Sequence, residues 1–162
     1  MAQPAYLWLK ANGADVQGEV ERNQANYDGA IEVVSFVDDV TTARERGSGM
    51  ATGERRFAPL RCRKRIDKST PLIQQALSKN EAVEGKIMFE RPTPAGDGTT
   101  QHYFTIEFSG GRVDSIQRSL PDTIDPASSA EPMTEWVGFV FERIVWRHEI
   151  ASTEFEDTWR SR

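Results

Sequence analysis

The sequence predicts a mainly β protein: a compact β-barrel of two packed antiparallel sheets, flanked by one α-helix and carrying one long extended loop. Three observations support this prediction. Short segments of alternating or continuous apolar residues recur along the chain, which is typical of strands. Only the stretch that begins at Ser69 combines a helix cap with helical spacing of apolar residues. The segment Thr134–His148 is apolar on both faces, as in a strand that is covered twice.

The composition is that of a soluble globular protein of 162 residues, with 38% hydrophobic and 28% charged residues. This length suits a single domain over residues 1–162 with one core. We expect no membrane insertion, because no apolar run approaches the roughly 18 residues of a spanning helix. We expect no secretory signal peptide either, since the amino terminus lacks the pattern of one. The single cysteine, Cys62, is predicted to be a small core residue.

Charge is distributed unevenly along the chain. The net charge of −5 argues against a general nucleic-acid binder. Basic residues nevertheless cluster between Arg55 and Lys68, whereas the tail after Arg147 is rich in Asp and Glu. Such polarity is suited to contacts between copies of the chain.

The first third of the chain is predicted to hold two strands, each followed by a loop. Tyr6–Lys10 forms a short strand, and the polar stretch Asp15–Gly29 forms a loop. Ile31–Val37 is rich in β-branched residues and apolar on both faces, which predicts a buried strand. Asp38–Glu54 has three glycines and little apolar content, so we expect a long exposed loop, and loops of this length are usually functional or mobile.

A basic strand and the single helix come next. In Phe57–Ile66 apolar and basic residues alternate, so one face is predicted to enter the core and the other to be basic. The helix has a cap at Ser69 and a proline in its first turn, and it should end near Lys79. Its predicted apolar face consists of Leu72, Ile73, Ala76 and Leu77.

Four strands are predicted in the second half of the chain. Gly85–Glu90 and His102–Phe108 should form a hairpin, with His102 on the same apolar face as Phe104. Arg112–Leu120 follows, and a proline-rich loop then leads into Thr134–His148. One face of this last strand should fill the barrel. The other face requires a second cover, such as the helix, a packed loop or a neighbouring subunit.

No motif indicates catalysis, a cofactor or a metal. His102 and His148 lie outside any metal-ligand spacing, and we expect structural roles for both. The segment GSGMATG, Gly47–Gly53, lacks the lysine and the following helix of a phosphate-binding loop. Solvation explains the paired carboxylates. We therefore predict a protein without catalytic residues, cofactor or metal, which is not an enzyme.

Three arginines share the basic face of the predicted strand: Arg61, Arg63 and Arg65. Such a face is able to contact phosphates. Binders of single-stranded nucleic acid place stacking aromatic side chains beside such cations, and this strand offers none. We therefore favour contact with an acidic protein surface over contact with nucleic acid.

The segment IDKSTPL, Ile66–Leu72, resembles the strand-to-helix passage of Hcp proteins, the tube subunits of bacterial type VI secretion systems. Further similar segments occur in the family's order at AYLWLK, IEVVSF, YFTIEF and MTEWVGFVFERIVW, so the resemblance covers nearly the whole chain. It implies a β-barrel flanked by one helix, six copies closing into a homohexameric ring, and rings stacking into a hollow tube. No cofactor is implied.

The resemblance also implies partners and a route. Such a tube is assembled in the cytoplasm on a baseplate, inside a contractile sheath and under a VgrG spike, and effector proteins travel in its lumen. It is then secreted without a signal peptide. The family's long early loop, associated with contacts between subunits, corresponds to Asp38–Glu54. We expect subunit or ring-stacking contacts at six residues: Arg44, Arg46, Met50, Arg61, Arg63 and Arg65.

The chain departs from the family pattern in two places. The proline-containing segment SLPDTIDPASSAEP, residues 119–132, replaces a glycine-rich turn, and the strand at residues 61–65 is unusually basic. The short tail after His148 leads us to expect no fused toxin domain.

Two other classes of protein stay open. A monomeric β-barrel binding module would bind protein or oligonucleotide through the basic strand 61–65, with strong salt dependence. An enzyme with a dispersed site would show a deep polar pocket with perturbed titratable groups.

Overall fold

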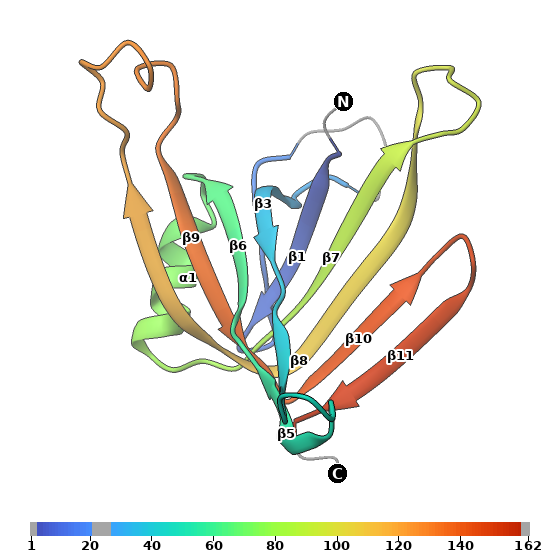
Figure 1. The fold of residues 1–162 in the computed structure, drawn as a ribbon. Coiled ribbons are helices and arrows are strands. Elements are labelled where there is room, and N and C mark those ends of the chain that lie inside the picture. The colour runs from blue at the N-terminus through green and yellow to red at the C-terminus, as the bar shows by residue number, and fades with distance from the viewer. Residues whose placement is uncertain (1–2, 21–26, 160–162) are drawn as a thin grey trace.

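A computed structural model describes residues 3–20 and 27–159, which form eleven strands and one α-helix (Figure 1). Residues 21–26 of the predicted loop 15–29 lie outside the described residues. In chain order the elements are β1 (Ala5–Ala11), β2 (Ala14–Val16), β3 (Ile31–Val37), β4 (Val40–Arg44), β5 (Ala51–Phe57), β6 (Leu60–Arg65), α1 (Thr70–Ser78), β7 (Val83–Pro92), β8 (Thr100–Ser119), β9 (Thr134–Val140), β10 (Arg143–His148) and β11 (Thr153–Thr158).

Six strands close into a barrel, which confirms the mainly β fold class. The order β8-β7-β1-β3-β6-β9 is hydrogen-bonded throughout, and β9 also pairs with β8, so the ring of strands has no free edge within it. All pairings are antiparallel. The hairpin β10–β11 extends the sheet from the first half of β8, and β2 pairs with β1. Closure satisfies the backbone groups that an open sheet would leave unpaired.

The long strand β8 replaces the two predicted strands His102–Phe108 and Arg112–Leu120. Its first half pairs with β10 and its second half with β9, so β8 must change neighbour at Gly110 and Gly111. Gly110 has a φ of +62°, and a Cβ on Gly111 would lie 2.6 Å from the carbonyl oxygen of Val140. Only glycine fits this backbone conformation and this close approach. The glycines therefore redirect a continuous strand, where we expected a break.

The prediction of one strand over Thr134–His148 is also wrong. Here one predicted strand is two, because the strand is interrupted at Phe141 and Glu142 and so divided into β9 and β10. β9 pairs with β6 and with the second half of β8, whereas β10 pairs with the first half of β8. The amide of Glu142 donates to the carbonyl of Ser109 at this crossing point. Apolar residues on both faces hid the break, because the pattern does not change across it. The acidic tail, for which no strand was predicted, forms β11.

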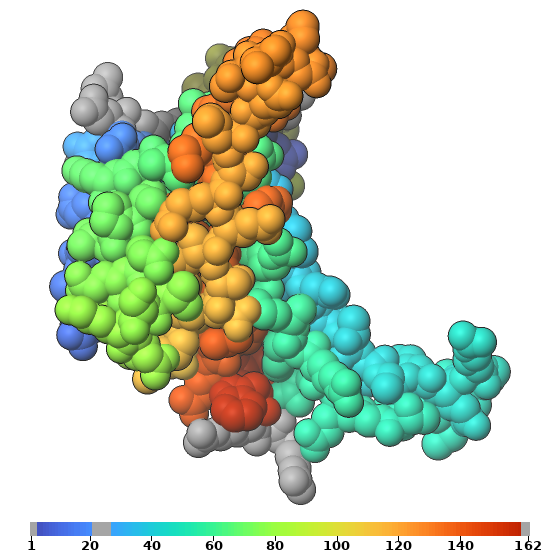
Figure 2. All heavy atoms as spheres, turned by 90° about the vertical axis from the view of Figure 1, so that its left-hand side faces the viewer, coloured from blue at the N-terminus to red at the C-terminus, as the bar shows by residue number. Residues whose placement is uncertain are grey.

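The predicted long loop Asp38–Glu54 is also corrected, since most of it belongs to the hairpin β4–β5. Val40 pairs with Phe57 at its base, and Arg44 pairs with Ala51 near its tip. Figure 2 shows that this hairpin, residues 40–57, projects from the body of the molecule as an arm. Because nearly all its side chains face solvent, it lacks the apolar alternation that would have predicted strands.

Two further strand predictions change in detail. The predicted strand Phe57–Ile66 is two strands, because the chain leaves the arm at Ala58 and Pro59 and enters the barrel at β6. β3 is buried on one face only: Val34 and Val37 are exposed on the outside of the barrel. A β-bulge between Val33 and Ser35 adds a residue there and resets which side chains point inward.

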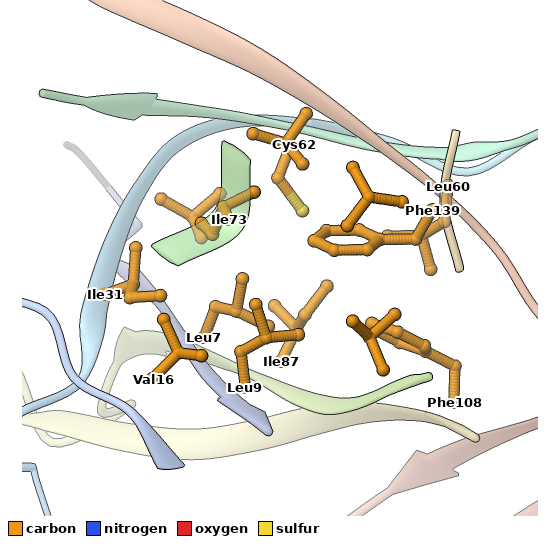
Figure 3. Packing of buried hydrophobic residues seen from close by; sticks show 14 of the residues in the cluster. Leu7, Leu9, Val16, Ile31, Leu60, Cys62, Ile73, Ile87, Phe108 and Phe139 are labelled. Carbon is orange, nitrogen blue, oxygen red and sulfur yellow. The ribbon is translucent and has the colours of Figure 1, made fainter. Parts of the chain in front are cut away.

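The core lies inside the barrel, where side chains from the wall meet those of α1 (Figure 3). Ile73 and Ala76 of the helix are buried there, which confirms the helix and most of its apolar face, although Leu72 is exposed. Cys62 is a buried core residue as predicted, and burial raises the pKa of its thiol. A second cluster, outside the barrel, packs Tyr27 and Ala30 against Tyr6.

Candidate functional site

A buried ion pair lies beneath the IDKSTPL segment. Lys64 Nζ is 2.6 Å from Glu135 Oε1, and neither side chain has more than 1% of its surface exposed. The same ammonium group is 3.0 Å from Asp67 Oδ1 and donates to Thr70 Oγ1 at 3.1 Å. Removing one member of such a pair leaves an uncompensated buried charge. The network therefore ties the start of α1 to β6 and β9.

The network continues from Glu135 to the outside of the barrel. Arg118 Nε donates to Glu135 Oε2 at 2.9 Å, and its terminal nitrogen donates to Gln74 Oε1 of the helix at 2.9 Å. Asp67 accepts the backbone amide of Ser69 at 2.9 Å and also its hydroxyl. The sequence patterns did not predict this role for Lys64 and Glu135, although each is a charged residue at an inward position of an otherwise apolar strand face. A charge at an inward strand position is the signal from which a buried ion pair could have been predicted.

The arginines of β6 have partners on the barrel surface. Arg61 and Arg65 are exposed and Arg63 is half-buried, whereas Cys62 and Lys64 are buried, which confirms the alternation. The Arg61 guanidinium lies 4.9 Å from the ring centre of Trp136. The expectation that no aromatic side chain accompanies these cations is therefore wrong. Trp136 comes from β9, which pairs with β6 in a register that no local pattern predicts.

The other two arginines of this face have polar neighbours. Arg63 Nε donates to Thr134 Oγ1 at 3.0 Å, and Arg65 Nε is 3.8 Å from Glu32 Oε2. These contacts orient a basic stripe along the outside of β6. Its exposed members lie beside the exposed valines of β3, since Val37 pairs with Arg61.

The three residues expected to contact other subunits from the predicted loop lie near the tip of the arm. Arg44 donates from its terminal nitrogen to the carbonyl of Gly49 at 3.1 Å and so helps to close the turn. Met50 is 67% exposed, and Arg46 is also exposed. The arm thus separates Arg44, Arg46 and Met50 from the arginines of β6, which lie on the barrel wall, and the six residues do not form one site.

The acidic tail pairs with basic residues of its own chain. Arg55 at the base of the arm donates to both carboxylate oxygens of Asp157 at 2.6 Å. Across the β10–β11 hairpin, Arg143 is 2.5 Å from Glu156, and this hydrogen bond holds the pKa of the Glu156 carboxyl below its ordinary value. Part of the acidic tail therefore pairs with basic residues of its own chain, and of the basic cluster Arg55–Lys68 it is Arg55 that takes part.

The histidines take polar positions. His102 Nε2 lies 2.6 Å from Thr105 Oγ1 and 3.9 Å from Glu149 Oε1. The prediction that His102 shares the apolar face of Phe104 is wrong, because a β-bulge at this point of β8 shifts the alternation. Within residues 3–20 and 27–159, no group of three or more His, Cys, Asp or Glu side chains is arranged to hold a metal ion. The one helix of these residues is too short to cross a bilayer.

The fold defines the class of this protein. It is a mainly β protein with a single closed barrel, one flanking helix and a projecting two-stranded arm. A family model described as type VI secretion system effector, Hcp, matches residues 6–148. The chain belongs to the Hcp family of type VI secretion proteins.

Individual relatives cover the chain almost completely. A protein of Pseudomonas aeruginosa named major exported protein is 28% identical over 99% of this chain and 98% of its own length. A crystal structure of an Hcp protein superposes with a TM-score of 0.87 at 21% identity and covers 99% of this chain and all of the other. The Hcp1 protein of Escherichia coli EAEC 042 superposes with a TM-score of 0.82 at 25% identity, covering 98% of this chain and 99% of the other. These similarities support the barrel, the helix and the arm as one common fold.

Proposed function

We propose that this chain is a structural tube subunit: six copies close into a homohexameric ring, rings stack into a hollow tube, and effector proteins are carried in its lumen. The arm is the observation that carries the proposal. A two-stranded hairpin is marginally stable alone in water, and this one exposes Val40 and Met50. An adjacent subunit would cover these side chains and hold the arm in place.

Family membership supports the remaining parts of the proposal. The chain acts as one Hcp-like domain over residues 1–162, without a cofactor and without catalysis. Its tube assembles in the cytoplasm with the baseplate and contractile sheath, carries a VgrG spike, and is secreted without a signal peptide or membrane insertion.

Within this tube, the arm tip and the basic stripe have different roles. Arg46 and Met50 contact an adjacent subunit, and Arg44 shapes the turn that presents them, because its side chain is bonded to Gly49. The exposed arginines of β6 contribute to subunit contacts from the barrel wall.

Solution mass and negative-stain images of the purified chain test the proposal. Uniform six-fold rings, with six times the 18.2 kDa mass of one chain, are the expected result. A stable monomer at high protein concentration would contradict the ring and, with it, the tube.

A second candidate function, a monomeric binding module for oligonucleotides, is favoured by one observation. The Arg61–Trp136 pair provides a cation beside an aromatic surface, the combination that single-strand binders use. Fluorescence anisotropy with a labelled oligonucleotide tests it. Binding that weakens steeply with salt and is lost in Arg61→Ala would support the module, and no binding at low salt would exclude it.

A further inference from the structure

A groove lies at the end of the barrel where the arm joins it. Its volume is about 940 Å³, and it runs between the base of the arm, the middle of β8 and the end of β9. Val140, Phe141 and Trp159 give it an apolar floor. Arg56 and Arg112, both exposed, place positive charge along it, and the carboxylates Glu54 and Glu142 also line it.

The other end of the β8–β9 pairing, where β8 ends and β9 begins, carries a protruding loop, residues 120–133, which lies at the far end of the molecule from the arm (Figures 1 and 2). Ile124 at this loop is 89% exposed, and Leu120 is 63% exposed. The loop contains three acidic residues and no lysine or arginine. It therefore combines apolar side chains with a net negative charge, which complements the floor and the arginines of the groove.

Internal hydrogen bonds hold the loop in shape. Asp122 Oδ1 accepts the backbone amide of Ile124 at 2.8 Å, and Asp125 Oδ1 accepts that of Ala127 at 3.0 Å. The Ser128 hydroxyl donates to the Asp122 carbonyl at 2.9 Å. A loop that is already ordered loses little conformational entropy when it binds, so Ile124 is presented at low cost.

The strand register relates the two surfaces. Ser119 pairs with Thr134 where β8 and β9 meet the loop, and Arg112 pairs with Val140 where the same strands meet the groove. Moving a second copy along these strands therefore brings its loop towards the groove of the first copy. Such a contact joins unlike surfaces and repeats without closing.

We propose that the loop 120–133 of one copy docks into the arm-base groove of the next copy, with Ile124 against the floor of Val140, Phe141 and Trp159. This contact rests on the proposed stacking of rings and assigns residues to it. The acidic loop of one copy faces Arg56 and Arg112 of the next copy. This attraction favours stacking of loop against groove over stacking in which two acidic loops meet.

Disulfide trapping in the full chain tests the contact. The double variant Ile124→Cys/Val140→Cys, oxidised at a concentration where the protein assembles, should give a ladder of covalently linked chains on a non-reducing gel. Leu72→Cys/Val140→Cys is the matched control, because Leu72 is exposed on the helix. The native Cys62 is buried and does not interfere.

The outcomes separate this contact from the proposed function. If tubes form but the ladder is no stronger than in the control, the contact is wrong and stacking stands. If neither rings nor tubes form in the unmodified chain, both proposals fail. As an independent check, Arg112→Glu should raise the concentration needed for tubes by about tenfold, because like charges then face each other. Arg112→Glu tubes that form at the original concentration would overturn the assignment.

Discussion

The buried network around Glu135 and the arm of residues 40–57 are stabilised in opposite ways. The Glu135 carboxylate contacts Lys64, Thr70 and Arg118, and Lys64 also contacts Asp67, so every charge in the network has a partner within the chain. The arm has solvent on nearly all sides and takes no part in the core cluster except through Phe57 at its base. Barrel stability is therefore internal to one chain, and we expect the arm to depend on other copies.

The largest expected effect comes from breaking the network. Glu135→Ala removes the buried carboxylate that lies 2.6 Å from the Lys64 ammonium group and leaves Asp67 as its remaining carboxylate partner. Because Arg118 loses its carboxylate partner as well, we expect the free energy of unfolding to fall by about 3–5 kcal/mol. Urea denaturation followed by tryptophan fluorescence measures the loss. Glu156→Ala is the control, because its ion pair with Arg143 is exposed and should contribute little. Equal losses in the two variants would contradict the distinction between network and surface.

A second effect compares the two faces of the helix. Ile73→Ala opens a cavity in the core and should lower the free energy of unfolding by about 2–5 kcal/mol, whereas Leu72→Ala removes an exposed side chain and should change it little. The same denaturation experiment measures both variants. A Leu72→Ala loss as large as that of Ile73→Ala would mean that the helix packs differently.

A third effect should appear in assembly and leave stability intact. Arg44→Glu/Arg46→Glu reverses charge on the exposed arm, so we expect a change in the free energy of unfolding within about 0.5 kcal/mol, intact rings and impaired tubes. Sedimentation and negative-stain images of the same samples provide the measurement. Lys79→Glu is the control, since Lys79 is exposed at the end of the helix. Tubes that match those of the unmodified chain would remove the arm from the stacking contact.

The smallest effect concerns a single carboxyl in the turn between β7 and β8. Hydrogen bonds from the hydroxyl and amide of Thr99 and from the hydroxyl of Thr93 lower the pKa of Asp97 to about 2. A lowered pKa in the folded state stabilises the turn above the ordinary pKa of Asp, and this stabilisation is lost as the pH falls towards 2. Carboxyl carbon shifts in an NMR titration report it. Thr99→Val should move the Asp97 pKa back towards its ordinary value, and an unchanged titration would contradict the role of Thr99.

Much of the fold could be predicted from the sequence because helix starts and strand alternation depend on residues that are neighbours in the chain. The proline at residue 71 marks the first turn of the helix, and alternation in β6 separates Cys62 from its basic neighbours. Ser69 occupies the predicted N-cap position, but its hydroxyl donates to Asp67 and makes no capping hydrogen bond to the helix.

The arm was missed because strands that bury neither face leave no apolar alternation. Arg44, Arg46 and Met50 lie near the tip of the arm, whereas the basic stripe lies on β6 in the barrel wall. The distance between the two groups depends on how the arm leaves the barrel, which no local pattern contains.

By itself, the sequence determined the mainly β class, the single helix, the buried cysteine and the resemblance to Hcp proteins. Each of these depends on neighbouring residues or on the order of segments. Tertiary structure decided the closure of the barrel, the break between β9 and β10, and the partners of Lys64, Arg55 and Arg61. Pairing of β6 with β9 brings Lys64 to Glu135 and Arg61 to Trp136, and register is a property of paired strands that no single segment contains. Arg55 instead reaches Asp157 because of where the arm lies, since β5 belongs to the small sheet and β11 to the large one.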